Sequence, residues 1–91
     1  MSTITTYAEK LDDHHWVGAW RLDDGRWYTL CRTPGYGEGT TGPEAIADAS
    51  RHGGVPRFHI RRTRREALAD AERFRQEEQT MRGTCIRASQ K

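Results

Sequence analysis

Residues 16–33 read WVGAWRLDDGRWYTLCRT, with aromatic and β-branched side chains on both sides of Asp23-Asp24-Gly25. Glycine tolerates the positive φ that a tight turn requires, so this segment predicts a β-hairpin. A three-residue loop would place Trp20 opposite Tyr28 and would gather apolar area on one sheet face. A two-residue turn is the alternative, and it would shift the second strand by one residue. With the three-residue loop, one face carries Trp16, Trp20, Leu22, Tyr28 and Leu30, and the other carries Val17, Arg21, Trp27, Thr29 and Cys31.

The segment after the hairpin predicts a short helix over residues 43–52. Thr41 and Glu44 have the spacing of a capping box, in which each side chain bonds the other's backbone amide. Gly53-Gly54 would end the helix, because glycine adopts the left-handed cap without strain. The residues expected to be buried are Ala45, Ile46 and Ala49.

Residues 55–62 predict a third strand, with Phe58 and Ile60 facing inward by the period of two. Thr63 and Glu66 form a second capping box, which predicts a helix over residues 64–82. The apolar stripe of that helix comprises Ala67, Leu68, Ala71, Phe74 and Met81.

Together these elements predict one small α+β domain of order β-β-α-β-α over residues 14–83. We expect two layers: a three-stranded sheet with an antiparallel N-terminal hairpin, and both helices on its aromatic face. The second sheet face would then remain open. Residues 1–13 are expected to form a flexible N-terminus and residues 84–91 a frayed C-terminus.

Composition narrows the class of protein. The chain has 91 residues, which is enough for a single domain, and 34% of them are apolar. It contains no apolar run near the roughly 20 residues that span a bilayer, and no secretory signal precedes the hairpin. Two cysteines, Cys31 and Cys85, are expected to be reduced thiols. These features predict a cytoplasmic protein with no membrane association.

Charge is distributed unevenly along the chain. Residues 1–50 hold four basic and eight acidic residues, a net −4, whereas residues 51–91 hold eleven and five, a net +6. The total of +2 conceals this division. A basic half of this kind suggests an anionic partner.

The basic residues gather between positions 57 and 65. Arginine suits phosphate because its planar guanidinium donates two parallel hydrogen bonds and stays charged. On the predicted strand these side chains would share the open sheet face with an exposed aromatic ring, on which a base could stack. The alternative is a solvated strand edge whose charge prevents aggregation. The candidate nucleic-acid-binding residues are Arg21, Trp27, Arg57, His59, Arg61, Arg62, Arg64 and Arg65.

Other chemistries find little support in the sequence. Cysteine and histidine spacings typical of zinc sites are absent, so no metal or cofactor is expected. The glycine-rich run 35–39 lacks the Gly-Lys-Ser/Thr ending of a phosphate-binding loop. The nucleophile–base pairs that could be proposed join Cys31 to His52 or His59. Catalytic residues are therefore not assigned, and the protein is expected not to be an enzyme.

Three short segments, 18–21, 26–28 and 63–67, resemble the arm-type DNA-binding domains of tyrosine recombinases. That resemblance implies a three-stranded sheet placed in a DNA groove and braced by one C-terminal helix. It covers about half of the chain. The helix at 43–52 separates strands that are consecutive in that family, so we do not assign membership.

The leading functional hypothesis is a small, non-catalytic module that binds nucleic acid through a basic sheet face. The alternative is a protein-protein interaction module, such as a small regulator or inhibitor encoded by a phage or mobile element. A homodimer would double the basic surface and is compatible with either hypothesis.

Overall fold

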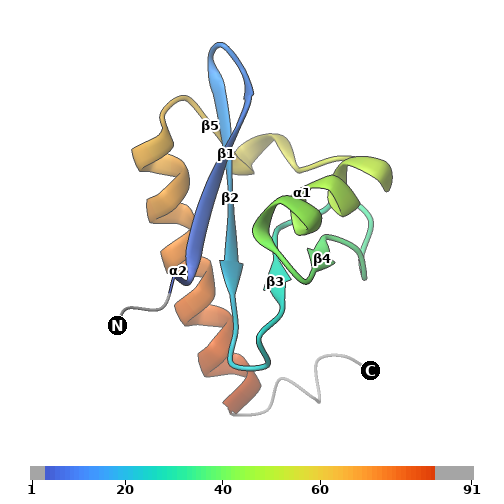
Figure 1. Ribbon diagram of the computed structural model, residues 1–91, viewed down its shortest axis with the longest axis vertical. Coiled ribbons are helices and arrows are strands. Elements are labelled where there is room, and N and C mark those ends of the chain that lie inside the picture. Colours follow the sequence, from blue (N-terminus) through green and yellow to red (C-terminus); the bar gives the residue numbers. More distant parts are fainter. Residues whose placement is uncertain (1–3, 84–91) are drawn as a thin grey trace.

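The computed structural model describes residues 4–83, and the termini 1–3 and 84–91 lie outside the described residues (Figure 1). An antiparallel sheet and two helices make a small α+β domain, as the sequence predicts. The elements are β1 (Thr6–Asp12), β2 (His15–Arg21), β3 (Trp27–Tyr28), β4 (Glu38–Gly39), α1 (Gly42–Arg51), the 3₁₀ turn η1 (Arg57–His59), β5 (Ile60–Arg61) and α2 (Arg64–Gly83).

Strand β2 is the centre of the sheet. The strand order is β1-β2-β3-β4, and β5 also pairs with β2. Strand β1 occupies one edge of β2 along its whole length, so β3 and β5 share the other edge. There β5 pairs with Trp16 and Val17, and β3 pairs with Trp20 and Arg21. Over residues 4–83 the sheet therefore has five strands rather than the predicted three.

The predicted register of the hairpin is confirmed. Trp20 pairs with Tyr28, and the Leu22 amide donates to the Arg26 carbonyl at 3.1 Å. Gly25 has φ of +83°, which is the left-handed conformation that closes a three-residue loop. The two-residue alternative is thereby excluded.

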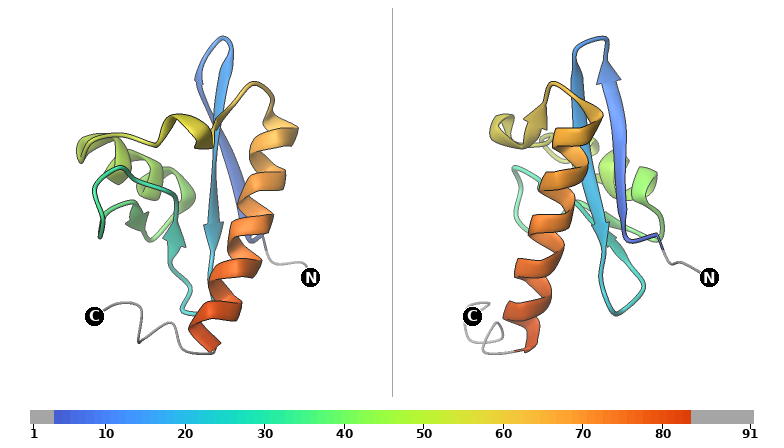
Figure 2. Two further views of the ribbon diagram at one scale, coloured as in Figure 1. Left: turned by 180° about the vertical axis from the view of Figure 1, so that it is seen from behind. Right: turned by 90° about the vertical axis from the view of Figure 1, so that its left-hand side faces the viewer.

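Both sheet faces are covered, one by each helix, which corrects the prediction of two layers with an open face. Figure 2 shows the sheet between α1 and α2. The even-numbered side chains Trp20 and Leu22 pack against Ala71 of α2. The odd-numbered Val17 and Ala19 pack against α1. Because consecutive residues of β2 face opposite sides, the central strand is buried against both helices.

Gly18 lets α2 approach the middle of β2. A Cβ atom at this position would overlap the carbonyl oxygen of Ala67 and come within 3.1 Å of the Ala71 Cβ. The helix backbone is thus in direct contact with the strand, where only glycine fits.

The carbonyl of Gly18 is equally important, because it lies at the gap between β3 and β5. It accepts hydrogen bonds from Thr29 Oγ1 at 2.7 Å and from His59 Nε2 at 2.9 Å. Both side chains are buried. Neither β3 nor β5 donates a backbone hydrogen bond to this carbonyl. The two side chains donate to it instead, so the buried backbone group is satisfied.

The N-terminus differs from the prediction, since residues 6–12 form β1 instead of a flexible segment. Few apolar residues mark this strand in the sequence. It is held by its ladder with β2 and by Tyr7, whose ring contacts α1 so closely that a Cβ at Gly42 would come within 2.8 Å of it. Such an edge strand depends on partners that local periodicity does not reveal.

The predicted strand over residues 55–62 is also corrected. Its centre is the turn η1, and pairing with β2 is limited to β5. The turn rotates two side chains relative to the prediction: Phe58 is 71% exposed and His59 is fully buried. The period of two fails because a 3₁₀ turn does not alternate its side chains between faces.

Both helix starts follow the N-cap threonines of the predicted capping boxes. The Glu44 amide donates to Thr41 Oγ1 at 3.2 Å, and the Glu66 amide donates to Thr63 Oγ1 at 3.1 Å. Ala45, Ile46 and Ala49 are buried as expected. The predicted core residue Met81 lies beyond the side chains that the structure describes. Over residues 4–83, neither helix has the length and apolar content to cross a bilayer.

The close contact at Gly18 leads to a stability prediction. Replacing Gly18 with alanine should lower the free energy of unfolding by about 3 kcal/mol, since the added methyl group meets backbone that cannot rotate away. Gly35→Ala is the matched control: its Cβ would meet no atom within 4 Å, and its φ is +92°. Gly35→Ala should lower the free energy of unfolding by only about 1 kcal/mol, because alanine is strained at a positive φ. Urea unfolding measures both, and an equal loss in the two variants would contradict the packing at Gly18.

Candidate nucleic-acid interface

The basic segment, residues 57–65, runs through η1, β5 and the first turn of α2. Four of its arginines, Arg57, Arg62, Arg64 and Arg65, are exposed. None of these four forms an ion pair with the residues that the structure describes. The segment lies beside the projecting tip of the β1–β2 hairpin, as both views in Figure 2 show. Within residues 4–83, this segment therefore carries four exposed arginines that no carboxylate compensates.

Arg61 has a different role from its neighbours. Its guanidinium donates to Asp70 Oδ2 of α2 at 2.6 Å and lies 3.7 Å from Glu66 Oε2. The hydrogen bond to Asp70 raises the pKa of Arg61 above its usual value. Asp70 is only 6% exposed, so this arginine compensates a buried carboxylate. Arg61 thus joins β5 to α2, which differs from the outward orientation predicted for it.

His59 is not a surface residue, which corrects its assignment as a binding residue. Its Nε2 atom donates to the Gly18 carbonyl, which can only accept, so in the neutral ring Nδ1 carries no proton. The ring lies edge-on to Trp20, with centroids 5.9 Å apart, and against Phe74 of α2 at 5.4 Å. Burial lowers the pKa of His59. The His59 side chain is therefore part of the core that supports the basic segment.

Arg21 and Trp27 also lie away from the basic segment. They pair with each other at the end of β2 opposite to the end that pairs with β5. Trp27 packs against the α1 core cluster, so its ring is not the open stacking platform that the sequence suggested. The prediction required an uncovered second face, and α1 covers that face.

The hairpin tip, residues 11–15, places other functional groups beside the basic segment. The β1–β2 register shifts between Lys10 and Asp12, so Leu11 is an extra residue in a bulge. Asp12 then lies opposite His15 and accepts from its Nδ1 at 2.8 and 2.9 Å. Hydrogen bonds from the His14 amide and then from the His15 ring lower the pKa of Asp12. The carboxylate fixes the orientation of the imidazole.

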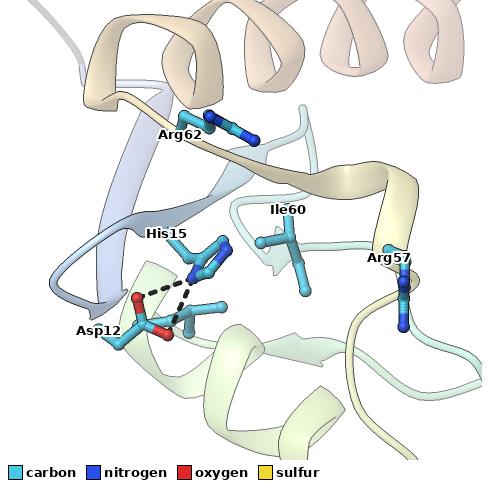
Figure 3. A pocket seen from close by; sticks show the side chains of 6 residues that line it. Asp12, His15, Arg57, Ile60 and Arg62 are labelled. Atoms are coloured by element: carbon cyan, nitrogen blue, oxygen red, sulfur yellow. Dashed lines mark hydrogen bonds and ion pairs between the residues drawn. The ribbon is translucent and has the colours of Figure 1, made fainter.

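A pocket of about 460 Å³ separates the hairpin tip from η1 and β5 (Figure 3). A second hollow of about 350 Å³ adjoins it and shares His15 and Arg62. In Figure 3 the Asp12–His15 pair stands at one side, Arg62 lies on the segment above it, and Arg57 lies at the far end. The first pocket is lined by Leu11, Asp12, His15, Arg57, Ile60 and Arg62, and the second by His14, His15 and Arg62.

The sequence therefore located part of this site and missed the rest. Arg57 and Arg62 line the pocket, and Arg64 and Arg65 begin α2 nearby. Leu11 and Asp12 belong to residues 1–13, which the sequence predicted to be flexible, and His15 was not among the predicted site residues. The Asp12–His15 spacing of three residues was the available signal, because a bulged tight turn brings positions i and i+3 together.

The structure also describes Cys31 and the glycine-rich loop, two features that the sequence analysis considered. The Cys31 thiol donates to the carbonyl oxygens of Ala49 and His52, at 3.6 and 3.4 Å, as a half-buried packing group does. In the glycine-rich loop, the Gly37 amide donates to the carboxylate of Asp48 at 2.7 Å. Within residues 4–83, no three or more His, Cys, Asp or Glu side chains form a group able to hold a metal ion.

Comparisons with protein-family models, with curated proteins and with solved structures gave no significant match.

The buried His59 predicts a specific pH dependence of stability. Its folded pKa is lowered, so its contribution is complete above the unfolded value of about 6.5 and is lost as the pH falls below it. His59→Gln keeps a donor for the Gly18 carbonyl and removes the titration. Between about pH 7.5 and about pH 5.5, the variant should lose less unfolding free energy than the wild type.

His14→Gln is the matched control, because His14 is exposed and its ring forms no hydrogen bond with the described residues. It should keep the pH dependence of the wild type in urea unfolding. If His59→Gln were as sensitive to acid as the wild type, the buried neutral imidazole would be contradicted.

Proposed function

We propose that this chain is a small binding module for nucleic acid, with the basic segment as its main contact. The observation that carries the proposal is the set of four exposed arginines without ion pairs to the described residues, on a segment whose middle is fixed to the domain. The Arg61–Asp70 pair and the β5–β2 ladder hold the backbone, so the neighbouring guanidinium groups need little ordering on binding. Arginine forks of this kind suit the oxygens of a phosphate backbone.

Phe58 supplies the aromatic surface in place of Trp27. Its ring is 71% exposed and follows Arg57 directly in the turn η1. Exposed aromatic rings beside arginines are typical of surfaces that stack on bases. A cation and a stacking surface thus occur on neighbouring residues.

The surrounding charges imply weak affinity. Asp12 and Asp13 belong to the hairpin tip, and the chain as a whole carries only +2. These acids reduce the positive potential that attracts a polyanion. Binding should therefore be weak, sensitive to salt, and stronger if a homodimer presents two basic segments.

A protein partner is the second candidate function, because large apolar side chains are exposed. Ile4 and Phe58 are each 71% exposed, and Leu11 is 41% exposed. An apolar protein interface persists at about 0.5 M salt, whereas phosphate contacts weaken steeply. Co-purification at high salt separates the two functions, and retention of a stoichiometric protein partner without nucleic-acid binding would favour this second one.

The leading proposal is tested by removing two of the exposed charges. Arg57→Gln/Arg62→Gln should weaken binding of a fluorescent oligonucleotide about 10-fold or more at low salt, since each lost cation removes a phosphate contact. The logarithm of wild-type affinity should fall linearly with the logarithm of salt concentration, with a slope of about 2–4. Fluorescence anisotropy measures both quantities.

Arg32→Gln/Arg51→Gln is the matched control, since it removes the same charge from exposed positions that line neither pocket. Its affinity should stay within about twofold of the wild type apart from the small effect of net charge. Equal weakening by the two double variants, or no binding to any nucleic acid at low salt, would end the proposal.

A further inference from the structure

The pocket between the hairpin tip and β5 differs in composition from the arginine surface around it. Leu11 and Ile60 give it apolar walls, while Arg57, Arg62 and His15 supply polar groups. Its volume of about 460 Å³ lies within the range of small-ligand sites, about 300–1,000 Å³. A contact with phosphates alone would need neither a hollow nor apolar walls.

The polar groups of this pocket are separated by its apolar walls. Figure 3 shows Arg62 above the Asp12–His15 pair and Arg57 at the other end, with Ile60 between the two arginines. The order is therefore cation, apolar surface, cation. One nucleotide with its two flanking phosphates has the complementary order of anion, sugar and base, and anion.

His15 adds a group that a sugar or base can use. Because the Asp12 carboxylate only accepts hydrogen bonds, His15 Nδ1 donates to it. In the neutral ring, Nε2 is then an acceptor, and Figure 3 shows this second nitrogen directed away from Asp12. Ribose hydroxyl groups and the amino groups of bases are suitable donors.

We infer that this pocket is a subsite for one unstacked nucleotide of a single strand. Its flanking phosphates meet Arg57 and Arg62, and its base lies against Leu11 and Ile60. In a duplex the bases are stacked and paired, and a base must leave the stack before it can lie in a pocket. The inference rests on the proposed function and adds a preference for single strands to it.

The bulge in β1 supports the assignment. The register shift at Leu11 leaves this side chain 41% exposed at the rim, and it sets Asp12 against His15. Bulges commonly redirect side chains next to functional sites. A regular hairpin would place these residues in other orientations, so the irregularity shapes the pocket.

The test compares single-stranded RNA and DNA of about 12 nucleotides with the matching duplexes by fluorescence anisotropy. The full chain should bind at least one of the single strands about fivefold or more tightly than its duplex, the effect of one base in an apolar contact. The RNA and DNA arms identify which sugar the pocket accepts.

Leu11→Ser and His15→Ala should each remove most of that preference and leave duplex affinity unchanged. Ile4→Ser is the matched control, an exposed apolar residue outside both pockets, and it should behave as the wild type. Urea unfolding of each variant verifies that the fold is retained.

The outcomes separate the two proposals. Equal affinity for single strands and duplexes, or Leu11→Ser and His15→Ala with wild-type preference, would overturn the subsite while leaving nucleic-acid binding intact. Loss of all binding in the wild type would overturn both. Single-strand affinity that is unchanged in Arg57→Gln/Arg62→Gln would contradict the phosphate positions in the subsite.

Discussion

The absence of a side chain at Gly18 is the constraint on which the rest of this structure depends. Because Gly18 has no side chain, the backbone of α2 packs directly against the central strand. The Gly18 carbonyl accepts hydrogen bonds from the side chains of Thr29, which follows β3, and of His59 in η1. A larger residue would move the helix away, and the buried carbonyl would then lose the geometry that satisfies it. Three parts of the chain that are distant in sequence thus meet at one peptide group.

The same arrangement accounts for the exposure of the arginines. Anchoring His59 inside the core makes residues 57–59 a turn, which directs Phe58 and Arg57 to solvent. The next anchor is Arg61, fixed by Asp70. The other arginines of the segment lie next to these two fixed residues, and their side chains are exposed. A rigid backbone with outward cations follows from two buried polar contacts, and the hairpin tip supplies the opposite wall of the pocket.

Much of the fold could be predicted from local chemistry, whereas the site depended on contacts between distant residues. Gly25 and the two capping boxes act within a few residues, so the hairpin register and both helix starts were predicted correctly. Whether α1 lies on the same face as α2 is decided by packing across β2, which no local pattern encodes. The orientation of His59 depends on the Gly18 carbonyl, 41 residues earlier in the chain. Periodicity alone therefore assigned Phe58 and His59 to the wrong faces and left residues 11–13 of the hairpin tip outside the domain.

The central claim is that nucleic acid contacts the basic segment and the hairpin tip together. Mapping amide chemical-shift changes in the full chain, during titration with a single-stranded oligonucleotide, tests this claim most directly. We predict that the largest changes fall within residues 11–15 and 57–66 and that residues 32–52 change little. Largest changes around the Tyr36–His52 ring stack, or in the second half of α2, would contradict the account.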